Sequence, residues 1–171
     1  MSNRSNGLVL KSCVVAAVSG LLGLAMVSPS HSESPHATVM KFGGSWSGGG
    51  TVKPLSGGSD RVNCKVKYDV KASSFTQKID CSGPKMKFDI DGKLNLQGSN
   101  VEGRWTDTNR GYSGGASGTV GNNKMDMVIQ GPDFRGRMNI AISGSTQTVS
   151  VTQYDVNSGK YKHVADIKLR K

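Results

Sequence analysis

The chain is poor in the residues that metal centres, nucleophilic active sites and disulfide-rich miniproteins need. Its 171 residues include three cysteines, three histidines and 6% aromatic residues. Three cysteines are too few for a disulfide-dense scaffold, and a hydrophobic content of 35% is too low for a protein with several membrane spans. The sequence contains no HExxH, GxSxG, P-loop or paired-cysteine motif. It therefore favours one ordinary domain with no catalytic residues and no metal site.

The N-terminal segment is typical of a secretory signal peptide. Arg4 and Lys11 precede an apolar run at residues 13–27, and small polar residues follow as far as Ser32. The run is shorter than the roughly 20 residues of a membrane-spanning helix. We therefore predict a signal peptide over residues 1–32 and a mature protein that is periplasmic or secreted and does not span the membrane. An uncleaved N-terminal anchor is the alternative.

The mature chain is predicted to be strongly basic. Loss of residues 1–32 removes Arg4 and Lys11 but no acid, which leaves 20 basic against 12 acidic residues and a net charge of +8. This balance favours anionic partners. In a secreted protein we expect anionic envelope components, lipid or glycan, rather than nucleic acid. A solvated exterior without a partner is the alternative.

Residues 43–171 have the two-residue periodicity of β-strands, whereas residues 33–42 read as a flexible leader. The clearest strand begins at Lys85 with KMKFDIDGKL, in which even positions are mostly apolar and odd positions are charged. Glycine and asparagine turns separate successive segments of this kind, and no helical periodicity interrupts them. The pattern predicts an antiparallel meander with one apolar face.

The two mature cysteines are predicted to form a cross-strand disulfide. A two-residue hairpin loop fixes which residues face each other. If the chain turns at Ala72-Ser73, Cys64 faces Cys81 at a non-hydrogen-bonded position, where side chains approach most closely. The turn and the cysteine spacing agree independently. In an oxidising compartment we expect a disulfide, which in the chain-entropy model stabilises the fold by about 3 kcal/mol.

Further turns extend the same register along the chain. They are Gly83-Pro84 (Cys81 facing Met86), Gly98-Ser99 (Leu96 facing Val101), Asn109-Arg110 (Trp105 facing Gly114), Asn122-Asn123 (Val120 facing Met125), Gly131-Pro132 (Ile129 facing Phe134), Gly144-Ser145 (Ile140 facing Val149) and Asn157-Ser158-Gly159 (Val151 facing Ala165). We predict an all-β protein with a single antiparallel up-and-down β-barrel of about ten strands over residues 43–171. An even number of strands lets the first pair with the last and close the barrel. An open two-sheet sandwich is the alternative.

The predicted inward face is apolar, rich in glycine and polar at one end only. Glycines on this face either let the strands coil or leave space for a ligand. Six polar residues share the inward parity near one end of the barrel: Asp107, Tyr112, Gln153, Asp155, Tyr161 and His163. Together with Trp46 and Trp105 they are the candidate ligand-binding residues, because small-molecule sites combine an apolar cavity with a few polar groups. Wet strand ends without a function are the alternative.

Two resemblances agree with the barrel. The segment GSWSGGG at residues 44–50 is similar to the Gly-x-Trp signature of lipocalin-like barrels and resembles the start of nitrobindin and fatty-acid-binding barrels. In the nitrobindin-like family a C-terminal histidine binds haem iron, so the resemblance implies His163 as the one candidate haem ligand; we otherwise expect no cofactor. A longer resemblance, to an uncharacterised family of small secreted alphaproteobacterial proteins, implies the location and the fold and no activity. It runs through GSWSGGG, RVNC at 61–64, Asp80-Cys81, VEGRW at 101–105, Ser113-Gly114 and IKLR at 167–170.

The sequence therefore favours a non-catalytic barrel that binds a small apolar or amphipathic ligand in its interior. The alternative is a protein that acts through its basic exterior, as an envelope-binding or protease-inhibitor-like barrel. Enzymatic activity is the third and least favoured hypothesis, because neither mature histidine, His36 or His163, has a nucleophile nearby in the sequence.

Overall fold

The computed structural model describes residues 33–171. The predicted signal peptide at residues 1–32 lies outside this part of the chain. The described residues contain one helix, α1 (Pro35–Phe42), and ten strands. The strands are β1 (Gly44–Val52), β2 (Asp60–Val70), β3 (Ser74–Ser82), β4 (Lys87–Gln97), β5 (Asn100–Asp107), β6 (Tyr112–Gly121), β7 (Lys124–Gly131), β8 (Phe134–Ser143), β9 (Thr146–Asp155) and β10 (Lys160–Arg170).

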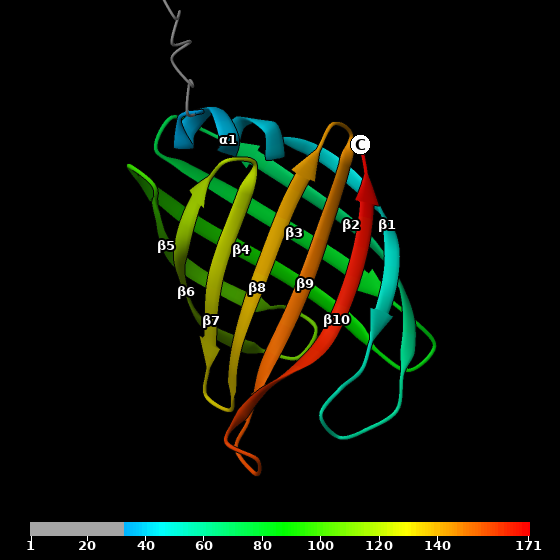
Figure 1. Cartoon of the computed structure of the whole chain (residues 1–171). Coiled ribbons are helices and arrows are strands. Elements are labelled where there is room, and N and C mark those ends of the chain that lie inside the picture. The colour runs from blue at the N-terminus through cyan, green and yellow to red at the C-terminus, as the bar shows by residue number, and fades with distance from the viewer. Residues whose placement is uncertain (1–32) are drawn as a thin grey trace, which may run out of the picture. The chain divides into compact units, whose positions relative to one another are not determined.

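The strands form one closed antiparallel barrel, as predicted (Figure 1). Each strand pairs with its neighbours in sequence, and β1 pairs with β10, where Gly50 faces Ile167. The meander places the loops at two ends. We call the end with the β1–β2, β3–β4, β5–β6, β7–β8 and β9–β10 loops the open end, and the opposite end, where β1 begins and β10 finishes, the closed end. Closure leaves no unpaired edge strand, so every strand is protected from pairing with another chain.

Most predicted hairpin registers are confirmed, and two are wrong by two residues. Cys81 faces Phe88 rather than Met86, because the β3–β4 loop takes four residues instead of two. Ile129 faces Gly136 rather than Phe134. There the two turn residues are Pro132 and Asp133, and the fixed φ of proline suits the first central position of a β-turn. A slip of two residues preserves the side-chain alternation, so both errors leave the predicted faces unchanged.

A β-bulge in β10 reverses the predicted orientation of two candidate site residues. Ala165 faces Val151 as predicted, but the register shifts by one between His163 and Ala165. Tyr161 and His163 consequently lie on the outer face, where Tyr161 packs against Tyr154 with ring centroids 5.4 Å apart. The prediction that both residues face inward is wrong, because an odd shift reverses the faces of all residues between the bulge and the turn.

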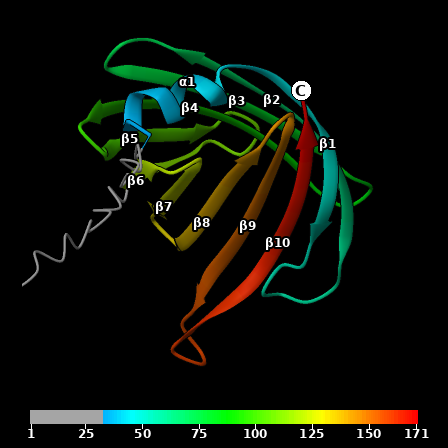
Figure 2. The ribbon, with the colours of Figure 1, turned by 45° about the horizontal axis from the view of Figure 1, so that its top comes forward.

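The predicted flexible leader instead contains α1, which covers the closed end (Figure 2). Ser34 caps the helix through a hydrogen bond from the Ala37 amide, and a proline occupies its first turn. Val39 and Phe42 are buried in the core. The Phe42 ring lies 5.7 Å from that of Tyr68, centroid to centroid. Eight residues are too few to form a stable helix in water, so burial against the barrel stabilises α1.

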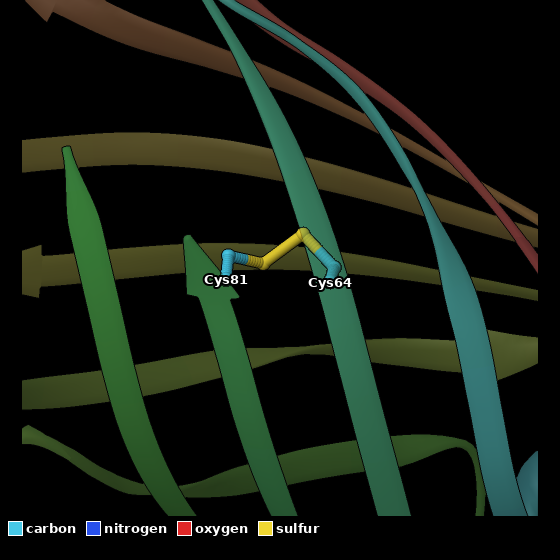
Figure 3. The surroundings of a disulfide bond; sticks show 2 residues. All are labelled: Cys64 and Cys81. Carbon is cyan, nitrogen blue, oxygen red and sulfur yellow. A yellow bond between two sulfur atoms is a disulfide. The ribbon is translucent and has the colours of Figure 1, made fainter. Parts of the chain in front are cut away.

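The disulfide between Cys64 and Cys81 is present at the predicted position (Figure 3). It joins β2 and β3 with a Cα–Cα distance of 4.0 Å. Both cysteines are buried and belong to the inward-facing core. The bond therefore cross-links two neighbouring strands on the inner face of the barrel wall. Within residues 33–171 the structure contains no helix with the length and hydropathy required to cross a bilayer.

Candidate functional site: a cavity inside the barrel

The barrel encloses a cavity of about 530 Å³. Its walls are almost entirely apolar. Side chains such as Val66, Ile79, Phe88, Met138 and Val151 line it from strands around the whole ring. Several lining residues are only partly buried although they point inward, among them Ile79, Met138 and Val151. Their partial exposure is to the cavity, so the interior is hollow rather than filled with side chains.

The inward glycine at position 114 does not create this space. At Gly114 an added Cβ would overlap with the carbonyl oxygen of Gln130 and would lie 2.9 Å from the indole nitrogen of Trp105. Trp105 covers this position and donates from that nitrogen to the carbonyl oxygens of Gly115 and Gln130, both at 3.2 Å. Glycine is therefore required here for the close approach of neighbouring strands. Of the two interpretations of the inward glycines, strand coiling applies at Gly114.

A small polar group lies at the closed end of the cavity. The hydroxyl of Tyr68 accepts hydrogen bonds from the side-chain amides of Gln147, at 2.7 Å, and Gln77, at 3.3 Å. Tyr68 and Gln77 line the cavity, while Gln147 is fully buried behind them. The Gln147 side-chain oxygen has no hydrogen-bond partner. The floor of the apolar cavity thus offers uncharged hydrogen-bonding groups.

Burial raises the pKa of Tyr68 to about 12, and the hydrogen bond from Gln147 opposes this effect without cancelling it. Loss of solvation disfavours the phenolate, so the hydroxyl stays protonated over the physiological range. Tyr68 therefore presents a neutral group to the interior. A cationic side chain beside it would have lowered the pKa instead.

The carboxylates at the open end serve mainly to fix turns. Asp107 accepts hydrogen bonds from the Asn109 and Arg110 amides at 3.0 and 3.1 Å. Asp155 accepts from the Asn157 amide and the Ser158 hydroxyl at 3.0 and 2.8 Å. Both carboxylates are buried. These contacts explain why aspartate ends β5 and β9, since Asp side chains mimic a backbone turn.

Asp155 also forms an ion pair with Lys162, at 2.6 Å. The hydrogen bond from Lys162, together with that from Ser158, lowers the pKa of Asp155 to about 2. Lys162 faces Gln153 across β9 and β10, on the inner side of the bulged segment. The bulge that turns Tyr161 and His163 outward therefore brings Lys162 to Asp155.

The predicted site residues fall into three groups. Trp105, Asp107, Tyr112 and Gln153 line the cavity. Trp46 is buried below α1, where its indole donates to the Phe42 carbonyl at 2.7 Å, and Asp155 caps the β9–β10 turn; neither lines the cavity. Tyr161 and His163 lie outside it, and His163 instead contacts Asp166 at 2.7 Å. His163 is thus not positioned to bind a haem inside this cavity.

Three polar residues in or beside the cavity are absent from the predicted site. Two of them, Gln77 in the lining and Gln147 buried beside it, share the parity of their apolar neighbours, so strict alternation identifies both as inward polar residues. The third is Arg110 at the open end, which the sequence places only in a turn, yet its guanidinium lies 4.7 Å from the centre of the Phe88 ring. No sequence signal identifies that contact. In the described part of the chain, no cluster of three or more potential metal ligands occurs.

Comparison with known proteins gives fold similarity and no family assignment. No protein-family model matches the sequence, and no curated protein matches it. Among solved structures, Rv2717c from M. tuberculosis superposes with a TM-score of 0.66 at 14% identity, over 82% of this chain and 99% of that chain. The S-type phycobiliprotein lyase CPES from Guillardia theta superposes with a TM-score of 0.61 at 10% identity, over 81% and 93%. Both similarities support the lipocalin-like barrel, while the resemblance to a secreted alphaproteobacterial family stays a prediction.

Proposed function

We propose that this protein is a non-catalytic barrel that binds a small apolar or amphipathic ligand in its interior, after export to the periplasm or the cell exterior. The observation that carries the proposal is the cavity of about 530 Å³ with apolar walls. Pockets for small molecules typically measure about 300–1,000 Å³ and combine apolar walls with few polar groups. The inward disulfide is consistent with an oxidising compartment.

The polarity of the cavity limits the class of ligand. Its closed end offers the neutral groups of Tyr68 and Gln77, whereas the cationic lining residues are Arg104 and Arg110, both with exposed side chains. An anion placed at the floor would lose its solvation without gaining a charged partner. A mostly apolar molecule with one uncharged hydrogen-bonding group fits better. Its polar group would lie beside Gln77 and its apolar body would contact the Met and Ile side chains.

The lining also supports a binding function over a catalytic one. It includes no serine, threonine, histidine or lysine, and its two cysteines are joined in the disulfide. Nucleophilic and acid–base catalysis depend on reactive groups placed next to one another. The two carboxylates of the lining are Asp107, which accepts hydrogen bonds from two amides of the β5–β6 turn, and Asp133, which is exposed in the β7–β8 turn. The phycobiliprotein lyase among the structural neighbours has an enzymatic name, but at 10% identity it supports the barrel alone.

A binding assay with a neutral apolar dye, N-phenyl-1-naphthylamine, tests the proposal. We expect saturable fluorescence enhancement with one site per chain, and competition by dodecanol that exceeds competition by dodecanoate. Val151→Trp fills space on the cavity wall and should abolish dye binding. Thr152→Trp places the same side chain on the outer face and is the matched control. Equal binding by both variants, or no saturable binding by the unmodified protein, would refute the proposal.

A further inference from the structure

Exposed apolar side chains gather at the open end of the barrel. In residues 33–171 four large apolar residues are exposed, and three of them lie at this end: Leu55, Tyr112 and Val156, with 37%, 56% and 80% of their surface exposed. Leu55 and Val156 are on the β1–β2 and β9–β10 loops, which project from the same end of the barrel (Figures 1 and 2). The fourth residue, Met40, is on α1 at the closed end. Because three of the four exposed large apolar residues share this end, it is the candidate interaction surface of the described residues.

The same end has a basic rim. Taken as the five loops and two strand residues on either side of each, the open end has seven exposed basic residues and one exposed acid, Asp133. The basic residues are Lys53, Arg61, Lys85, Lys87, Arg110, Arg135 and Lys160. Its other three acids are Asp60, Asp107 and Asp155, which are buried and bonded to neighbouring backbone or side-chain groups. The net charge of this end is therefore +3, and its positive groups are the accessible ones.

We propose that the open end docks on an anionic lipid bilayer, with Leu55, Val156 and Tyr112 entering the interface and the basic rim contacting lipid headgroups. Apolar tips surrounded by Lys and Arg are the combination that binds bilayer interfaces. Each basic residue near an anionic surface contributes roughly 1 kcal/mol, which corresponds to about a fivefold change in affinity. A purely electrostatic partner would leave the exposed apolar tips unexplained.

Docking in this orientation connects the bilayer to the cavity. The lining extends to residues of the open end, including Pro54, Tyr112 and Phe134, while no lining residue belongs to α1. An apolar ligand could then pass between the lipid phase and the barrel without crossing water. The docking surface stands on exposure and charge alone. The transfer of ligand through it rests additionally on the proposed function.

Co-sedimentation with vesicles tests the docking. The purified protein should bind vesicles of equal parts phosphatidylcholine and phosphatidylglycerol, and should bind vesicles of phosphatidylcholine alone at least tenfold more weakly. The double variant Leu55→Ser/Val156→Ser should lose on the order of tenfold in affinity for the mixed vesicles, because it removes two apolar side chains that would be buried in the bilayer interface. Met40→Ser, an equivalent change at the closed end, should bind as the unmodified protein does.

Charge variants and a soluble polyanion separate a bilayer from other anionic partners. Lys53→Gln/Lys160→Gln should weaken vesicle binding by about 25-fold, and Lys71→Gln/Lys124→Gln, at the closed end, should weaken it much less. Equal sensitivity to both pairs would refute the orientation. Binding to dextran sulfate as tight as that to vesicles, with no effect of Leu55→Ser/Val156→Ser, would assign a polyanion as the partner and overturn the proposal. So would a failure to bind mixed vesicles.

The outcomes distinguish this inference from the proposed function. Val151→Trp should retain vesicle binding although it loses the dye. Leu55→Ser/Val156→Ser should retain dye binding in solution although it loses the vesicles. If the unmodified protein binds vesicles but no dye, the cavity proposal fails and the docking surface stands. If it binds dye but no vesicles, the reverse holds.

Discussion

Tyr68 on β2 and Gln147 on β9 are joined by a hydrogen bond of 2.7 Å, although 79 residues separate them in the chain. The two strands are not neighbours in the barrel, because β1 and β10 lie between them. The bond therefore spans the interior at the closed end, where the Phe42 ring of α1 covers Tyr68. It links two strands of the wall that are not adjacent, below the helix, and lies at the floor of the cavity.

The Tyr68→Phe substitution should destabilise the protein by about 1–2 kcal/mol at neutral pH, because it leaves the fully buried Gln147 amide without its partner. Urea-induced unfolding followed by circular dichroism measures this loss. Tyr112→Phe removes the hydroxyl of an exposed tyrosine and is the control, with an expected change within ~0.5 kcal/mol.

The same substitution should change the response to alkaline pH. Tyr68 has a pKa of about 12 in the folded protein, above the ordinary value of 10.0. The folded state therefore favours the protonated hydroxyl over the phenolate. The resulting contribution of Tyr68 to the unfolding free energy is fully present below pH 10 and decreases as the pH rises from 10 to 12. The difference in unfolding free energy between the unmodified protein and Tyr68→Phe should shrink over that range. A constant difference between pH 9 and pH 12 would contradict the elevated pKa.

The closed end should depend strongly on α1. Phe42 is fully buried, so Phe42→Ala should cost about 3–5 kcal/mol in unfolding free energy. Met40, two residues earlier in the helix, is 51% exposed, and Met40→Ala should be nearly neutral. Urea unfolding of both variants measures the contrast. Similar stabilities would mean that the helix does not pack on the barrel in solution.

The fold could be predicted from sequence because its information is local. Alternation sets the faces of each strand, and short turns set the register between neighbours. The Cys64–Cys81 pair confirms one such register at atomic detail. The two misplaced turns change the register by an even number of residues, so the predicted inward and outward faces stay correct. The inward and outward faces were therefore predicted correctly in every hairpin without a bulge, even where the register was not.

Three features of the structure do not follow from alternation and turn length alone. The bulge between His163 and Ala165 has no signature in the residues themselves, and it turned two candidates, Tyr161 and His163, to the outer face. Helix α1 carries a Ser34-Pro35 start signal, but its eight residues form a helix because the barrel buries Val39 and Phe42. Whether the interior is hollow depends on the summed volume of the inward side chains of all ten strands relative to the space inside the barrel. No single strand determines that sum.

Removing the disulfide should weaken the barrel without destroying the cavity. Cys64→Ala/Cys81→Ala should lower the unfolding free energy by about 3 kcal/mol. The reason is that the disulfide closes a loop between residues 17 positions apart, and without it the unfolded chain regains that conformational entropy. Both side chains line the cavity, so dye affinity is a second readout. We expect saturable dye binding to persist wherever the variant is folded. A loss of dye binding in the folded variant would show that the disulfide is part of the binding surface.

The ion pair at the β9–β10 turn should make part of the stability sensitive to acid. Asp155 has a pKa of about 2 against an ordinary value of 3.8, through its hydrogen bonds from Lys162 and Ser158. The folded state therefore favours the ionised form of Asp155. The contribution of this carboxylate to the unfolding free energy is present above about pH 4 and is lost as the pH falls to about 2. Asp155→Asn should therefore be less stable than the unmodified protein at pH 7.

This deficit of Asp155→Asn should narrow steadily between pH 4 and pH 2, as urea unfolding at several pH values would show. Asp133→Asn is the appropriate control, because Asp133 is exposed in the β7–β8 turn. It should show little deficit at any pH. A pH-independent deficit would mean that Asp155 stabilises the turn through its shape and hydrogen bonds rather than through its charge.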